Sequence, residues 1–222
     1  MGTEDHNTSR MLRDCVCLDH IRSRPESSTR LRSRSMAFFT TKQATRAGFT
    51  EPTHRYHVRA GNWIREHRGI YRIANFPTTD RPDLMLWYLW SQNRLEIPQG
   101  TYSHSTALSL HELSDLMPSK LHMTVPKEFR RNVIPDILVL HRAELKPGEV
   151  QEMHGVRVRR PLRTITDLLQ GDGTDRSQLK LALDEALRRG LIVRKEIERM
   201  PHIICKIRLT VPGTELKESS RA

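Results

Sequence analysis

The sequence predicts an α+β protein in which an N-terminal winged helix-turn-helix is followed by a mixed α+β domain. Three observations support this prediction. Two short helical patterns are separated by a turn, a basic β-hairpin follows them, and later strand-like runs alternate with amphipathic helices. A chain of 222 residues suffices for one large domain or two small ones. We expect four segments: an arm at 1–35, the winged helix at 36–76, the α+β domain at 77–210, and a tail at 211–222.

The two helices of the predicted helix-turn-helix are bounded by residues that commonly cap helices. Thr40 or Thr41 can cap the first helix, and Gly48 follows it as a usual helix stop. Thr50 can cap the second helix, which we expect to end near Ala60. The short loop between the helices fits a helix-turn-helix.

A β-hairpin is predicted directly after the second helix. Trp63–Arg65 and Ile70–Ile73 are rich in residues that favour strands, and Glu66–Gly69 is the predicted turn between them. Two helices followed by a hairpin are the order of elements in a winged helix.

The second domain is predicted from a longer series of elements. We expect a helix capped by Asp80 and a helix at His104–Leu113, then strands and a hairpin, and finally helices that include an amphipathic one. The predicted ranges after residue 113 are Leu121–Val125, Ile137–His141, Val150–Met153, Val156–Val158, Pro161–Leu169, Ser177–Arg189 and Arg194–Met200.

The segment before the first helix lacks hydrophobic periodicity and is rich in Ser, Thr and Arg, which predicts disorder. Two interpretations remain open. Residues 1–35 form a flexible arm that adds phosphate contacts, or translation starts at Met36.

The positive charge is concentrated in the predicted winged helix. Residues 37–76 contain seven Lys and Arg against two Asp and Glu, a net charge of +5 in a chain whose total is +11. Residues 77–150 have a net charge of −1, and residues 151–222 have +5. Clustered positive charge is typical of nucleic-acid binding, although many basic surfaces are only solvated.

The second helix is predicted to enter the major groove of DNA, where Arg can read guanine. The arginines of the hairpin would contact phosphates or the minor groove. The predicted DNA-binding residues are Thr41, Lys42, Gln43, Thr53, Arg55, Tyr56, Arg59, Arg65, Arg68 and Arg72. The alternative is a winged helix that contacts a protein. His54 and His57 stand where apolar residues are expected, and either burial or a rotation of the helix toward DNA would explain them.

Several classes of protein are not supported by the sequence. No run of 18 apolar residues is present, so no membrane-spanning helix is predicted. The N-terminus lacks the apolar core of a secretory signal. Three cysteines, Cys15, Cys17 and Cys205, form neither a disulfide framework nor a zinc motif, which favours a cytoplasmic protein.

The sequence contains two patterns that are similar to metal or nuclease sites, but neither predicts such a site. His104 and His111 share a helical face, but they do not form a metalloprotease motif. Asp136 with Glu144 and Lys146 is similar to a restriction-nuclease pattern, whose carboxylates hold a metal. The two acids are close in sequence and Pro147 follows, so Glu144 and Lys146 are not expected on a paired strand. We expect no enzyme activity, no cofactor and no metal.

Five stretches in order resemble the AbiEi-type antitoxin family of type IV toxin–antitoxin systems. They are Phe39–Ala44 with Ala47-Gly48, Arg68–Ile73, Tyr102–Leu108 with Leu110-His111, Leu121–Pro126, and Pro161–Leu168, and Ala186–Leu191 also fits. The resemblance covers about Phe38 to Met200. It implies a winged helix joined to an antitoxin domain, repression of its own operon at a double-stranded DNA operator (an inverted repeat is one form), and neutralisation of a nucleotidyltransferase-like toxin. The two histidines, and the weakly represented helix before the helix-turn-helix, depart from the family pattern.

Overall fold

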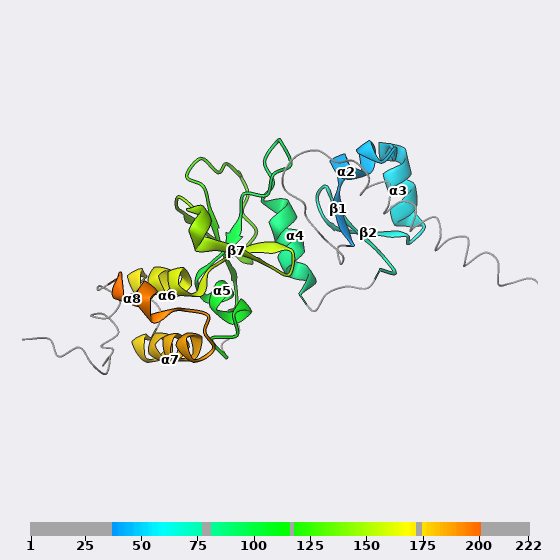
Figure 1. Ribbon diagram of the computed structural model, residues 1–222. Helices are drawn as coiled ribbons and strands as arrows, with labels where there is room; N and C mark the ends of the chain where they lie inside the picture. The colour runs from blue at the N-terminus through cyan, green and yellow to red at the C-terminus, as the bar shows by residue number, and fades with distance from the viewer. Residues whose placement is uncertain (1–36, 77–80, 116–117, 172–174, 201–222) are drawn as a thin grey trace, which may run out of the picture. The chain divides into compact units, whose positions relative to one another are not determined.

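The computed structural model describes residues 37–76, 81–115, 118–171 and 175–200. Within these ranges the protein is mixed α+β, with seven α-helices and two β-sheets (Figure 1). Contacts divide it into two units. The first comprises the described residues up to Gln99 together with 154–156, and the second comprises 100–153 and the described residues from Arg157 onward. The predicted arm and tail lie outside the described residues.

The first unit contains a small antiparallel sheet and three helices. Its strands are paired in the order β1-β3-β2. The elements are β1 (Phe38–Thr40), α2 (Thr41–Arg46), α3 (Glu51–Arg59), β2 (Trp63–His67), β3 (Ile70–Ile73) and α4 (Pro82–Trp90).

Helix α2 begins at a reciprocal cap formed by two side chains. The Thr40 hydroxyl accepts a hydrogen bond from the Gln43 backbone N–H at 3.3 Å, and the Gln43 side-chain oxygen accepts one from the Thr40 N–H at 2.7 Å. Gly48, at a φ of 94°, follows the helix in the left-handed region that favours glycine. Thr50 is the N-cap residue of α3, as predicted, but its side chain makes no capping hydrogen bond.

An aromatic core holds the first unit together. Phe39, Ala44, Trp63 and Ile73 are buried and pack as one cluster. The Phe39 and Trp63 rings meet edge to face with their centroids 4.7 Å apart. Burial of each large apolar side chain stabilises the fold by about 1.5–3 kcal/mol. Because the cluster draws residues from β1, α2, β2 and β3, it fixes the helices against the sheet.

Two predicted boundaries in this unit are corrected. The hairpin turn is Arg68-Gly69 rather than Glu66–Gly69, since β2 extends to His67. Helix α4 begins at Pro82 with Arg81 in the N-cap position, and the predicted cap Asp80 lies outside the described residues. Helix α4 contacts β1 and β3, so it belongs with the first unit although the sequence grouped it with the second domain.

The second unit contains a mixed sheet with helices α5–α8. Its strands are ordered β6-β5-β4-β8-β7, and β5 pairs with β6 in parallel and with β4 antiparallel. The elements are β4 (Thr101–Tyr102), α5 (His104–Leu110), β5 (Leu121–Val125), β6 (Leu138–Arg142), a 3-10 turn (Pro147–Glu149), β7 (Val150–Met153), β8 (Val156–Arg159), α6 (Pro161–Gln170), α7 (Arg176–Arg188) and α8 (Arg194–Glu198).

The helices of the second unit share an aliphatic core. Leu179, Leu183 and Ala186 are buried on one face of α7, as its periodicity predicts, and Leu187 packs beside them. Ile165 of α6 joins the same cluster. Helix α5 is shorter than predicted and ends at Leu110. None of the helices in the described ranges is long and apolar enough to cross a membrane.

Candidate nucleic-acid interface and histidine cluster

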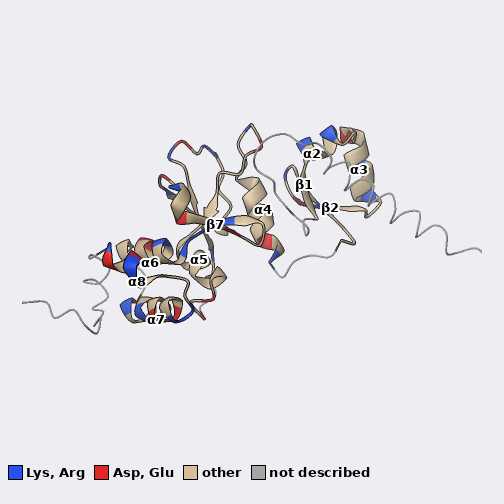
Figure 2. Ribbon diagram, in the orientation of Figure 1, with Lys and Arg blue, Asp and Glu red and all other residues tan. Residues whose placement is uncertain are grey.

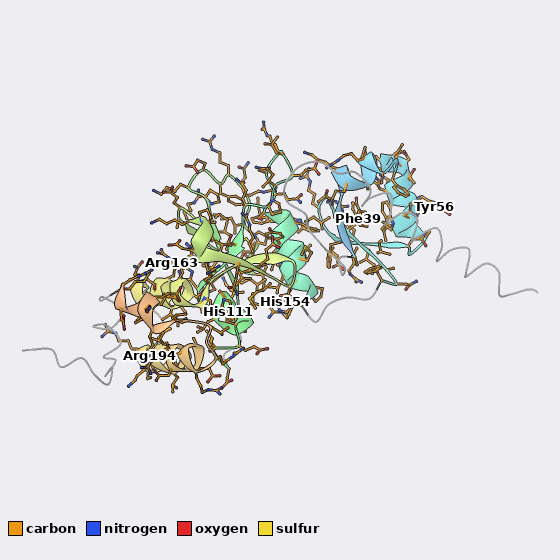
Figure 3. All side chains as sticks on the ribbon, viewed as in Figure 1. Phe39, Tyr56, His111, His154, Arg163 and Arg194 are labelled. Atoms are coloured by element: carbon orange, nitrogen blue, oxygen red, sulfur yellow. The ribbon has the colours of Figure 1, made fainter. Side chains whose placement is uncertain are left out.

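The outer face of α3 carries the exposed residues of the predicted recognition helix. Pro52, Arg55, Tyr56 and Arg59 stand three or four residues apart and therefore share a face. Together with Glu51 they line a shallow open groove. Tyr56 is 64% exposed and lies on the side of α3 away from the core residue Phe39 (Figure 3). The Arg55–Glu51 ion pair is solvent-exposed, so it holds Arg55 only weakly.

The inner face of α3 explains the two histidines. His54 is 2% exposed, and its Nε2 lies 2.9 Å from the carbonyl oxygen of Phe49. The His57 ring stacks on Trp63 with centroids 4.7 Å apart. Both histidines therefore belong to the aromatic core, and the structure supports burial rather than a rotated helix.

The β2–β3 turn lies beside the start of α2. The Thr41 N–H donates to the Gly69 carbonyl at 2.9 Å, which brings Arg68 close to the first turn of α2. Arg65 on β2 and Arg68 in the turn are exposed. Within the described residues, no carboxylate forms an ion pair with Arg59, Arg65 or Arg68. Figure 2 shows Lys and Arg on both α2 and α3.

Other predicted DNA-binding side chains already have partners within the first unit. Gln43 is used in the cap of α2, and the Thr53 hydroxyl lies 2.9 Å from that of Thr50. Arg72 is half-buried and its Nε donates to Glu66 at 2.6 Å. The Lys42 ammonium donates to the Arg94 carbonyl at 3.0 Å. Thr41 is half-buried at the start of α2. Arg55, Tyr56, Arg59, Arg65 and Arg68 are thus the most available of the set.

The nuclease-like pattern is not assembled around one strand. Asp136 precedes β6 and Glu144 follows it, so the strand separates the two acids. Five strand residues span about 16 Å at 3.3 Å each. Lys146 lies in the loop after β6, where no strand is formed. One divalent metal requires carboxylates that converge on it, which these two do not.

Three histidines that the sequence pattern did not group converge in the second unit. His104 begins α5, His122 lies on β5 and His141 lies on β6, and each is half-buried. One ring nitrogen from each lies within 4.8 Å of the others. His122 Nδ1 is 3.0 Å from His141 Nε2. His104 and His141 stack with their centroids 3.6 Å apart.

The pairing of β5 with β6 places two of these rings on one side of the sheet. Thr124 is the partner of His141 in the parallel register, and His122 is two residues from Thr124, so the three side chains share a face. Helix α5 contacts β5 and supplies His104. His104 has a φ of 50°, in the left-handed region that non-glycine residues rarely occupy.

Burial favours the neutral form of the three histidine rings. Burial, then the neighbouring His141 and His122, lower the pKa of His104 to about 3. Burial is also the main cause that lowers the pKa values of His122 and His141. At 3.0 Å, His122 Nδ1 and His141 Nε2 share one hydrogen bond, in which one nitrogen donates and the other accepts. The His104 ring stacks on His141.

A buried ion-pair network lies in the same unit. Arg159 is 1% exposed and donates to Glu149 at 2.7 Å, and its Nε is 3.5 Å from Asp167. Arg163 Nε lies 2.9 Å from the other Asp167 oxygen. His111, which the sequence pattern paired with His104, is buried and has its Nε2 2.7 Å from the Arg159 carbonyl. It therefore has a structural partner of its own. Figure 3 labels Arg163 and His111.

Comparisons with known proteins leave the family open. No protein-family model matches the chain, and no curated protein matches it. Among solved structures, the crystal structure of RV2827C protein from Mycobacterium tuberculosis is similar over 76% of this chain and 70% of that chain, at 15% sequence identity and a TM-score of 0.39. A similarity of this size says nothing about function, which is therefore inferred from the residues and their geometry.

Proposed function

We propose that the first unit is a winged helix-turn-helix that binds double-stranded DNA and that the protein regulates transcription. The order of β1, α2, α3, β2 and β3 supports this proposal, because a helix pair followed by a β-hairpin is the winged helix arrangement. In such domains the second helix of the pair lies in the major groove. Here that helix is α3.

The observation that carries the proposal is the outer face of α3. Arg55, Tyr56 and Arg59 are exposed there, while His54 and His57 face the core. Two arginines one turn apart can contact neighbouring bases in one groove, and the tyrosine between them can contact a phosphate or a base. Arg65 and Arg68 add positive charge from the hairpin, where phosphates or the minor groove are within reach.

The test is binding of the full chain to a fragment of its own promoter and to random duplex, by fluorescence anisotropy at several salt concentrations. We expect tighter binding to the promoter than to random duplex. The logarithm of the affinity should fall linearly with the logarithm of the salt concentration. Replacing Arg55 and Arg59 with Ala should cost about 1–3 kcal/mol for each base-reading interaction that is removed, and should reduce the promoter preference.

The matched control removes the same charge from the second unit. Arg194→Ala with Arg199→Ala changes two exposed arginines at α8 and should leave the promoter preference unchanged. If the α3 variant keeps its full promoter preference, the assignment of α3 is wrong. If the unsubstituted protein shows no salt-dependent binding to any duplex, the first unit serves a protein partner instead.

The resemblance to AbiEi-type antitoxins extends the proposal. In that role the protein represses its own operon and neutralises a nucleotidyltransferase-like toxin encoded beside it, in the cytoplasm and without catalysis of its own. Co-expression separates the two activities. Full-length protein with Arg55→Ala and Arg59→Ala, expressed from an unrelated promoter, should still restore growth if protection acts through the toxin. Loss of rescue in that variant would show that protection depends on DNA binding.

A further inference from the structure

The second unit holds a histidine cluster that DNA binding does not use. The cluster consists of His104 on α5, His122 on β5 and His141 on β6. One ring nitrogen of each histidine lies within 4.8 Å of those of the other two. We propose that these three histidines form a site for a first-row transition metal, and that Zn²⁺ is the ion that fits it best. The proposal is independent of the DNA-binding function.

The chemistry of the donor set favours zinc. Neutral imidazole is a ligand for Zn, Cu, Fe and Ni, whereas Mg²⁺ and Ca²⁺ take oxygen ligands. Three histidines that leave a fourth position for water are a known Zn²⁺ arrangement. Each of the three residues is half-buried rather than fully buried.

The ring spacing agrees with shared coordination. Two imidazoles that bind one tetrahedral Zn²⁺ through bonds of about 2.0–2.1 Å place their ring centroids roughly 5 Å apart. His122 and His141 have centroids 5.2 Å apart, and His104 and His122 are 5.9 Å apart. The stacked pair His104 and His141, at 3.6 Å, is closer, so metal binding turns the His104 ring away from its stack.

The surrounding groups orient the ligands. His104 Nδ1 is 3.0 Å from the Ser103 hydroxyl, which also accepts a hydrogen bond from Thr124 at 2.8 Å. This contact leaves His104 Nε2 for the metal, and a hydrogen bond at the second ring nitrogen is the usual support of a metal-bound histidine. The His122 backbone N–H donates to the Thr106 hydroxyl at 2.8 Å, which fixes β5 against α5.

The nearby charges do not oppose a cation. Arg159 and Arg163 are the cationic side chains that act on His104 electrostatically. Each forms an ion pair with Glu149 and with Asp167, so two positive charges are balanced by two negative ones. The negative charge of Asp167 also acts on His141, where it favours a positive charge. A divalent ion at the cluster therefore meets no uncompensated positive charge from this network.

The experiment measures Zn²⁺ binding to the full-length protein, purified without a histidine tag and freed of metal with a chelator. Cys15, Cys17 and Cys205 are replaced with Ser so that no thiolate competes. Calorimetry with zinc chloride should give one equivalent of Zn²⁺ per chain. His104→Gln, His122→Gln and His141→Gln should each weaken binding by more than about 100-fold, since loss of a supporting group already costs 10–100-fold.

The control is His154→Asn, which removes an exposed histidine outside the cluster and should leave affinity and stoichiometry unchanged. A second measurement covers the case in which a variant fails to fold. In the protein with its histidines intact, the ¹⁵N resonances of three histidine rings should shift on addition of one equivalent of Zn²⁺. Absence of a saturable one-equivalent event, or equal affinity in all three cluster variants and the original protein, overturns the proposal and leaves a metal-free histidine cluster.

Discussion

The backbone N–H of Thr41 donates to the carbonyl oxygen of Gly69 at 2.9 Å, so the first turn of α2 is fastened to the turn between β2 and β3. This hydrogen bond extends the pairing of β1 with β3, whose last partners are Thr40 and Ile70. As a result, the hairpin turn that carries Arg68 has a fixed place beside α2.

Gly69→Ala tests this connection. Gly69 has a φ of 77°, and an added Cβ would lie 3.4 Å from the Thr41 hydroxyl. The left-handed conformation costs a non-glycine residue about 1–2 kcal/mol, so the free energy of unfolding should fall by that amount. Urea denaturation followed by tryptophan fluorescence measures the first unit, because all three tryptophans, Trp63, Trp87 and Trp90, lie there.

Gly148→Ala is the matched control for this substitution. Gly148 lacks the left-handed φ and has open space where a Cβ would stand, so the change should cost no stability. Because Gly148 lies in the second unit, its urea denaturation is followed by circular dichroism, which reports on both units. An unchanged urea midpoint in Gly69→Ala would show that the turn relaxes and does not require glycine.

Arg159→Met should destabilise the second unit strongly. Arg159 is 1% exposed, and its removal leaves Glu149 and the buried Asp167 with one cation fewer. Removal of one partner from a buried ion pair costs about 3–5 kcal/mol. Thermal denaturation followed by circular dichroism measures the decrease. Arg188→Met, which breaks the surface pair with Glu185, should have no measurable effect; equal destabilisation by both would refute a special role for the buried network.

The elements predicted correctly are those whose signals are local. A cap at Thr40 or Thr41, and two short strand patterns on either side of His154-Gly155, are signals that act over a few residues. The structure places α2 and the β7–β8 hairpin where these signals indicate. Strand β4 was not predicted, because Thr101–Tyr102 has only two residues and is too short to show a strand pattern. It is a strand because it pairs with β5 and β8, and this depends on the tertiary fold.

The histidine cluster shows the same limit for site prediction. Spacing in the sequence paired His104 with His111, since both stand on one predicted helix. The structure separates them: His111 contacts the Arg159 carbonyl, while His104 meets His122 and His141. The β5–β6 register that joins the latter two is formed by strands 12 residues apart, so only the three-dimensional structure reveals the cluster.

The stability of the protein should decrease in acid partly through His111. Burial is the main cause that lowers its pKa in the folded state, followed in the same direction by Arg189. A histidine with a lowered folded pKa stays neutral while the unfolded chain takes up a proton below about pH 6.5. Its contribution is therefore fully present above that pH and declines as the pH falls below it.

The measurement is urea denaturation from about pH 7.5 to about pH 5, on either side of the unfolded histidine pKa, for the original protein and for His111→Gln. Because the other titratable groups are common to both, the difference between the two pH profiles reports on residue 111. As the pH falls over this range, the free energy of unfolding should decrease more in the original protein than in His111→Gln. The difference in slope should be at most that produced by the uptake of one proton on unfolding. Parallel profiles would contradict the assignment of a neutral, buried His111.

Arg68→Ala should weaken binding to promoter and random DNA about equally, if the proposed DNA-binding function holds. Arg68 is exposed in the β2–β3 turn, from which the proposal has it contact phosphates or the minor groove rather than the major groove. Removal of one phosphate interaction lowers the salt slope by roughly one unit. Arg72→Ala is the comparison, because Arg72 on β3 is half-buried and paired with Glu66 at 2.6 Å. Its substitution should leave the salt slope nearly unchanged. If both variants reduce the salt slope equally, the ion pair between Arg72 and Glu66 opens on DNA and Arg72 also contacts a phosphate. If only Arg72→Ala reduces the salt slope, the proposed placement of the hairpin turn against DNA is wrong.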